Sequence, residues 1–194
     1  FDLARYYRVK GSVNLAIEKY KILMNNELYA TYADSALGML VETYTERGQY
    51  DRAREFLRLE AAAYNEPEYA QLMYNRLGAL AESLDSYDEA IAWYDSSLSA
   101  GQSSDRNVEA LLGIGRSFRD LNRWYEAAST FSRIIEDYPD TSRQYEIYRS
   151  LADVYYLQGR IQDAIHAGES ALARADGADT SDLLLLLARM YQEV

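Results

Sequence analysis

The fold of this chain is decided by the stretch LLGIGRSFRDLNRWYEAASTFSRIIEDYPD, residues 111–140. Apolar residues recur in it at helical spacing on both sides of Asn122, a residue type that tolerates a left-handed backbone. The alanine that follows this turn returns every 37 residues along the chain, at Ala16, Ala53, Ala90, Ala127 and Ala164. A fixed period of this size is typical of stacked helical hairpins. We therefore expect an all-α chain.

The residues before each repeated alanine predict a tight turn between two helices. Five positions earlier stand only residues that accept a left-handed backbone: Gly11, Gly48, Asp85, Asn122 and Gly159. The alanine itself allows the two helices of a hairpin to cross closely. Together with the loop residues, this pattern predicts one solenoid domain over 1–194, with repeats at about 1–31, 32–67, 68–104, 105–141 and 142–180 and a final helix over 181–194.

These residues resemble the tetratricopeptide repeat family. The family pattern is clearest in the fourth repeat, at Ile114, Gly115, Phe118, Trp124, Ala127, Phe131 and Pro139. The resemblance implies a right-handed superhelical solenoid of five hairpins plus one C-terminal helix. It also implies that the first helix of each hairpin lines a concave groove. The period here exceeds the usual length in the family, which predicts longer helices or loops and an altered superhelix.

Two stretches are similar to bacterial envelope members of that family. Residues 4–36 resemble the start of the D-type outer-membrane β-barrel assembly lipoproteins. Residues 135–141 resemble the inter-repeat link of those lipoproteins and of periplasmic cell-division coordinators. This similarity implies a role in bacterial envelope assembly. Of the two possible locations, periplasmic and cytoplasmic, the similarity favours the bacterial envelope.

Composition argues against several classes of function. The formal net charge of −11 opposes binding to nucleic acid and to anionic membranes. The sequence has no apolar run long enough for membrane insertion by this chain, no cysteine, and a single histidine, His166, expected to face solvent. We therefore predict no catalytic residues, no metal and no cofactor. Because the chain starts at Phe1 without an initiator Met, we expect it to be a piece of a longer protein.

The packing pattern leaves some residues of the first helices free to face the groove. These predicted partner-binding residues are Arg5, Arg8, Glu42, Asn75, Glu82, Arg116, Arg119, Arg149, Asp153 and Tyr156. Three arginines among them would cluster and suit the carboxylates of an acidic or C-terminal segment. The competing interpretation is that Arg116 and Arg149 are neutralised by Asp120 and Asp153, four residues further along each helix.

The sequence thus predicts a non-catalytic scaffold that binds a protein or peptide partner, as an extended segment or a helix in the groove. One alternative is a structural module that oligomerises through its ends and convex face. Five consecutive leucines, Leu183 to Leu187, support it as a self-association surface, unless a further helix of a longer protein covers them. A second alternative is a regulatory domain of a larger protein.

Overall fold

The computed structural model describes residues 6, 10, 12–24, 30–63 and 67–193. Across these ranges it contains ten helices and no strand. The helices are α2 (Val13–Met24), α3 (Ala30–Thr45), α4 (Tyr50–Ala63), α5 (Pro67–Glu82), α6 (Tyr87–Ala100), α7 (Ser104–Asp120), α8 (Trp124–Asp137), α9 (Gln144–Leu157), α10 (Ile161–Leu172) and α11 (Ser181–Gln192). The all-α prediction is confirmed, and the first helix of the predicted first repeat lies outside the described residues.

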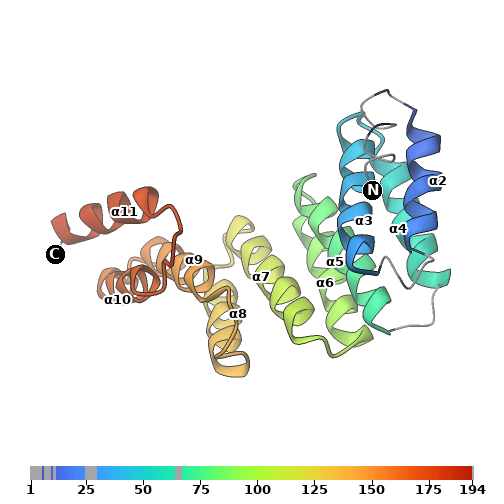
Figure 1. Ribbon diagram of the computed structural model, residues 1–194. Helices are drawn as coiled ribbons and strands as arrows, with labels where there is room; N and C mark the ends of the chain where they lie inside the picture. Colours follow the sequence, from blue (N-terminus) through green and yellow to red (C-terminus); the bar gives the residue numbers. More distant parts are fainter. Residues whose placement is uncertain (1–5, 7–9, 11, 25–29, 64–66, 194) are drawn as a thin grey trace.

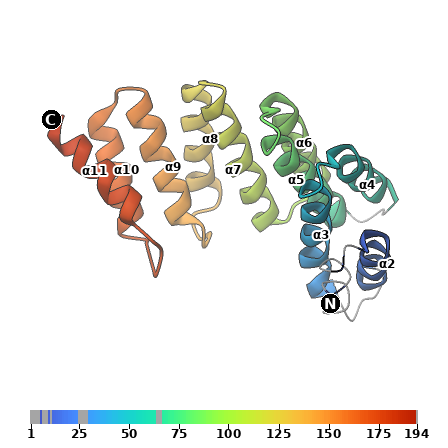
Figure 2. The same ribbon diagram turned by 90° about the horizontal axis from the view of Figure 1, so that it is seen from above.

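The helices form a superhelical solenoid in which each one packs on the next along the chain (Figures 1 and 2). We call α3, α5, α7, α9 and α11 the A helices, and α2, α4, α6, α8 and α10 the B helices. Successive A helices also contact one another, from α3 to α5, α5 to α7 and α7 to α9. No pair of successive B helices makes contacts as extensive among the described residues. The A helices therefore form the inner row of the curved stack.

Four of the five predicted turns lie within the described residues, and each has a left-handed residue that ends an A helix; the fifth, at Gly11, lies outside the described residues. The backbone φ is 66° at Gly48, 54° at Asp85, 59° at Asn122 and 73° at Gly159. At the second turn of this set, the N–H of Ser86 bonds the carbonyl of Ala81 at 2.9 Å, and Asp85 bonds Glu82 at 3.0 Å. These two bonds make a Schellman motif, which satisfies carbonyls at the end of the helix. These four turn positions are therefore confirmed.

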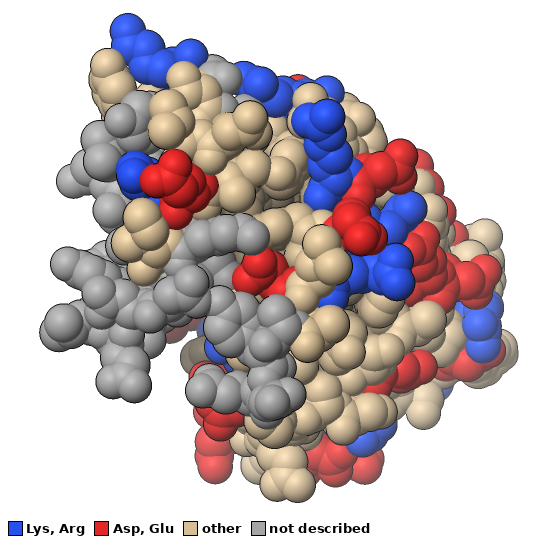
Figure 3. All heavy atoms as spheres, turned by 90° about the vertical axis from the view of Figure 1, so that its right-hand side faces the viewer, with Lys and Arg blue, Asp and Glu red and all other residues tan. Residues whose placement is uncertain are grey.

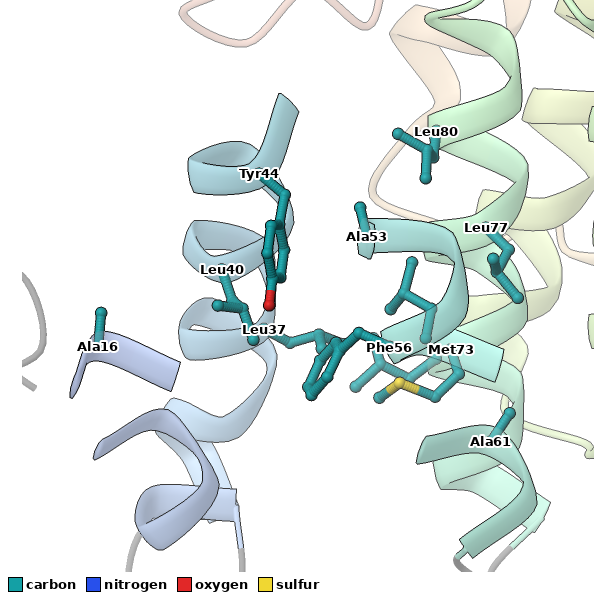
Figure 4. Close-up of a cluster of buried hydrophobic side chains, with 12 residues drawn as sticks. Ala16, Leu37, Leu40, Tyr44, Ala53, Phe56, Ala61, Met73, Leu77 and Leu80 are labelled. Atoms are coloured by element: carbon teal, nitrogen blue, oxygen red, sulfur yellow. The ribbon is translucent and has the colours of Figure 1, made fainter. Parts of the chain in front are cut away.

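The repeated alanines lie at the helix crossings. All five, from Ala16 to Ala164, have 0% exposed surface. Figure 4 shows one such region, where Ala53 and Phe56 of α4 lie between side chains of α3 and α5. A larger side chain at the crossing would hold the backbones apart. Alanine therefore recurs at these positions because the two helices of each hairpin approach closely there. The division of the chain into repeats at the boundaries given above stays a prediction.

Candidate partner-binding face

Amide side chains join the N-terminal ends of neighbouring A helices. Gln71 of α5 donates from Nε2 to Oδ1 of Asn107 on α7 at 2.8 Å. Asn107 in turn donates from Nδ2 to the hydroxyl of Tyr138 at 3.1 Å. Asn75 donates from Nδ2 to the carbonyl of Arg106 at 3.0 Å and to Glu109 at 3.1 Å. These bonds fix the spacing of α5 and α7 along the inner row.

Further along the same row, four charged side chains link three repeats; we call Glu82, Arg116, Glu146 and Arg143 the charge network. Arg116 of α7 binds Glu82 of α5 through two nitrogens, Nε at 3.2 Å and Nη2 at 3.1 Å. Its third nitrogen, Nη1, lies 3.4 Å from Oε1 of Glu146 on α9. Arg143 holds the other oxygen of Glu146, with Nη2 at 2.7 Å and Nε at 2.9 Å. Charges of alternating sign therefore run from α5 to α9.

Tyr94 anchors one end of the charge network. Its ring is buried on α6 and its hydroxyl donates to Oε2 of Glu82. Burial is the main cause that raises the pKa of Tyr94, and the Glu82 carboxylate raises it further. The phenol therefore stays protonated and remains a donor at every physiological pH. This bond and the two from Arg116 leave Glu82 with little freedom.

The arginines predicted to cluster do not form the ion pairs that spacing along the helix suggested. Arg116 bonds Glu82 and Glu146 in place of Asp120, whereas Asp120 bonds Arg119 at 2.7 Å. Arg149 lies 3.7 Å from a carboxylate oxygen of Asp182, near the start of α11. Asp153 lies close enough to Arg149 and Arg119 to feel both charges, yet burial outweighs them and raises its pKa.

The remaining predicted groove residues have varied surroundings. Asn75 has only 1% of its surface exposed, so it serves the contact between A helices and does not present its amide to a partner. Tyr156 is partly exposed and donates its hydroxyl to Glu193 at 2.8 Å. Glu42 is exposed on α3. Arg5 and Arg8 lie outside the described residues.

The sequence prediction missed Arg143, which lies just before α9. This residue and Arg106 line a pocket of about 370 Å³ between the N-terminal ends of α7 and α9. Arg143 precedes Glu146 by three residues, and this helical spacing was the available signal. It was overlooked because the packing pattern selects residues within A helices and not those immediately before them.

The leucine run of α11 divides between two faces. Leu183 and Leu187 are buried against α10, with 1% and 4% exposed surface. Leu184 and Leu185 are 51% and 57% exposed. Leu186 is partly buried against the same cluster. Three leucines therefore hold the helix on the solenoid, and two remain at the surface.

The face of the molecule over α2 and α4 carries charges of both signs (Figure 3). Figure 3 views the molecule from the side of α2 and α4 and shows Lys and Arg side chains scattered among Asp and Glu. In the part of the chain that the structure describes, no helix is long and apolar enough to cross a membrane. Within the same residues, no group of three or more His, Asp or Glu side chains is placed to hold a metal ion.

A helical-hairpin solenoid with a polar inner row defines the class of protein, and comparison with known proteins defines the family. The tetratricopeptide repeat model matches residues 39–105 and 106–179, most of the chain. The chain therefore belongs to the tetratricopeptide repeat family, as its resemblance implied. The fold generally serves as a scaffold for protein–protein interaction and is generally non-catalytic.

Solved structures show the same fold at low sequence identity. BtubC (BKLC) from P. vanneervenii is 16% identical with a TM-score of 0.79, over 94% of this chain and 81% of that one. A tetratricopeptide repeat protein from Parabacteroides merdae ATCC 43184 is 20% identical with a TM-score of 0.62, over 99% and 70%. A chain of the APC/C hetero-tetramer Cut9–Hcn1 is 17% identical with a TM-score of 0.64, over 96% and 35%. No curated protein matches the sequence.

Proposed function

We propose that this chain binds an extended segment of a partner protein along the inner row, over α7 and α9. The observation that carries the proposal is the set of partly exposed, charged side chains that faces this row from neighbouring repeats. Asp153 of α9 lies close enough to Arg149 of the same helix and to Arg119 of α7 to feel both charges, and none of the three is fully exposed or fully buried. Such side chains can contact a bound backbone or side chain without first exposing the core.

The general behaviour of the family supports this proposal. Tetratricopeptide repeats commonly bind protein partners, and one structure with this fold is a chain of a hetero-tetramer. An extended segment fits the inner row because polar groups recur along it once per repeat, as the amide and charge contacts between A helices show. A role in bacterial envelope assembly, implied by residues 4–36 and 135–141, would supply the setting for such a partner.

The test starts from random peptides, so that it assumes no particular partner. We would select peptides that bind the immobilised chain and measure their affinity by fluorescence anisotropy. The groove variant is Arg149→Ala with Asp153→Ala, an arginine and an aspartate four residues apart on A helix α9. The matched control is Arg133→Ala with Asp137→Ala, the same residue types at the same spacing on B helix α8, where they form an exposed ion pair at 3.1 Å.

We expect the groove variant to weaken binding roughly tenfold, because losing one hydrogen bond to a charged group costs about 1.5 kcal/mol, which corresponds to about a factor of ten in affinity. The control should leave the affinity within about twofold, since exposed ion pairs contribute little. Equal losses in the two variants, with unchanged helicity, would place binding elsewhere. The exposed Leu184 and Leu185 would then favour association through the end of the solenoid.

A further inference from the structure

We infer that Arg116 and Arg143 form a carboxylate-binding subsite, and that Glu146 occupies it as an internal ligand which a partner carboxylate replaces. The inference rests on the proposed function, because it names the group of the bound segment that this part of the inner row takes. Its physical basis is the geometry of the charge network. One carboxylate lies between two guanidinium groups, and each of its oxygens faces a different arginine.

The two acidic residues of the charge network differ in how firmly they are held. Glu82 accepts two bonds from Arg116 and one from Tyr94, and its side chain is 17% exposed. Glu146 is 38% exposed and reaches Arg116 of the neighbouring repeat through one nitrogen at 3.4 Å, a long contact for a charged pair. Its two shorter bonds, at 2.7 and 2.9 Å, come from Arg143, three residues earlier and itself 36% exposed. Glu82 is therefore a fixed part of the fold. Glu146 is held mainly by an exposed i,i+3 ion pair with Arg143, and a pair of this kind contributes less than about 1 kcal/mol, so Glu146 can turn away at small cost.

The position of Glu146 in its helix makes that movement local. It is the third residue of α9, in the first turn, where its side chain has no preceding helical turn to confine it. Its other partner, Arg143, precedes the helix and lines the pocket between α7 and α9 with 36% of its side chain exposed. Rotation of Glu146 would therefore free Nη1 of Arg116 and the guanidinium group of Arg143, on neighbouring repeats, with no change in helix packing.

Two arginines converging on one position select a carboxylate by charge and by hydrogen-bond geometry. A guanidinium group offers donors in a planar fork, and a carboxylate accepts from both of its oxygens. The chain as a whole is acidic, with a formal net charge of −11. An acidic segment would therefore be repelled at long range, and its binding requires a local site of this kind. Together with Glu82, Glu146 balances the charge of the two arginines until such a segment arrives.

The decisive variant is Glu146→Gln, which keeps the side-chain shape and removes the charge that competes with the ligand. The control is Glu136→Gln, which removes the same charge from an exposed position on B helix α8. The probes are three labelled peptides: alternating Glu and Ala with an amidated C-terminus, alternating Gln and Ala with an amidated C-terminus, and the latter with a free C-terminus. Binding is measured by anisotropy at low and at moderate salt.

We expect Glu146→Gln to bind a carboxylate-bearing peptide roughly tenfold more tightly than the wild type, with no change for the amidated Gln peptide. A gain for the Glu peptide assigns the subsite to an acidic side chain, and a gain for the free C-terminus assigns it to a terminal carboxylate. Adding Arg143→Gln to the variant should abolish either gain. A gain no larger than that of Glu136→Gln would refute the inference, since it would reflect only the change in net charge. If the selected peptides still depend on Arg149 and Asp153 in that case, the proposed function stands without this subsite.

Discussion

Replacing Gly113 by alanine tests the close packing that builds the inner row. Gly113 of α7 and Gly78 of α5 lie on either side of the buried ring of Tyr94. A Cβ at position 113 would lie 2.2 Å from Cζ and 2.3 Å from Cε2 of that ring. The ring has no room to retreat, because a Cβ at Gly78 would lie only 2.6 Å from its Cε1 atom. Its hydroxyl is also held by Glu82.

Two opposing effects set the size of the change. Alanine is more favourable than glycine inside a helix by about 1 kcal/mol. Overpacking a rigid core costs roughly 1–3 kcal/mol, and the upper part of this range applies where neither neighbour can move. We therefore expect Gly113→Ala to lower the free energy of unfolding by about 1–2 kcal/mol.

The matched control is Gly38→Ala in α3, where the added Cβ would have no atom within 4 Å. Only the propensity effect applies there, so we expect a gain of about 1 kcal/mol. Urea unfolding followed by far-UV circular dichroism measures both variants. A Gly113→Ala protein as stable as the wild type would refute the packing argument. In a Tyr94→Leu background, the same substitution should lose most of its cost, which a double-mutant cycle would report.

Two further predictions concern a turn and a buried carboxylate. Gly48→Ala should lower the free energy of unfolding by about 1–2 kcal/mol although the space around the added Cβ is open, because φ is 66° there. Gly48→Asn should cost less in the same urea assay, since Asn122 adopts a φ of 59° at the equivalent turn. Because burial raises the pKa of Asp153 above its ordinary value of 3.8, its ionisation lowers wild-type stability as the pH rises through the raised pKa. Asp153→Asn should therefore melt at a higher temperature than the wild type at neutral pH, and this advantage should disappear below pH 3.8 in thermal melts. A constant difference across that range would contradict the stated cause.

The sequence was sufficient to predict features that depend on one repeat alone. The repeated alanines mark the helix crossings, and the hairpins could be located from them. Asp85 and Asn122 stand where glycine ends other A helices, and the turns could be located from these positions. Both features follow from local backbone geometry and from the space between two helices. A period visible in one sequence carries that information directly.

The candidate site was harder to predict because its contacts join different repeats. The rule for neighbours within a helix paired Arg116 with Asp120, but the structure pairs it with Glu82 and Glu146, which lie 34 and 30 residues away. Similarly, the packing pattern left Asn75 free, although contact between α5 and α7 buries it. Which residue of the next repeat faces a given side chain depends on the tilt and rise of the stack. A change in period from the family's usual length alters both.

The curvature of the stack has a consequence for recognition. Where A helices touch, a charged residue on the inner row binds a charged residue of the adjacent repeat even without a partner, as Arg116 binds Glu82 at 3.1 Å. A partner can therefore gain little at Nε and Nη2 of Arg116, the two nitrogens that Glu82 binds. It gains most where the internal contact is long and exposed, as between Arg116 and Glu146 at 3.4 Å. Specificity in such a groove then depends on which internal ion pairs a ligand can replace, and the number of charged residues alone is a poor guide to it.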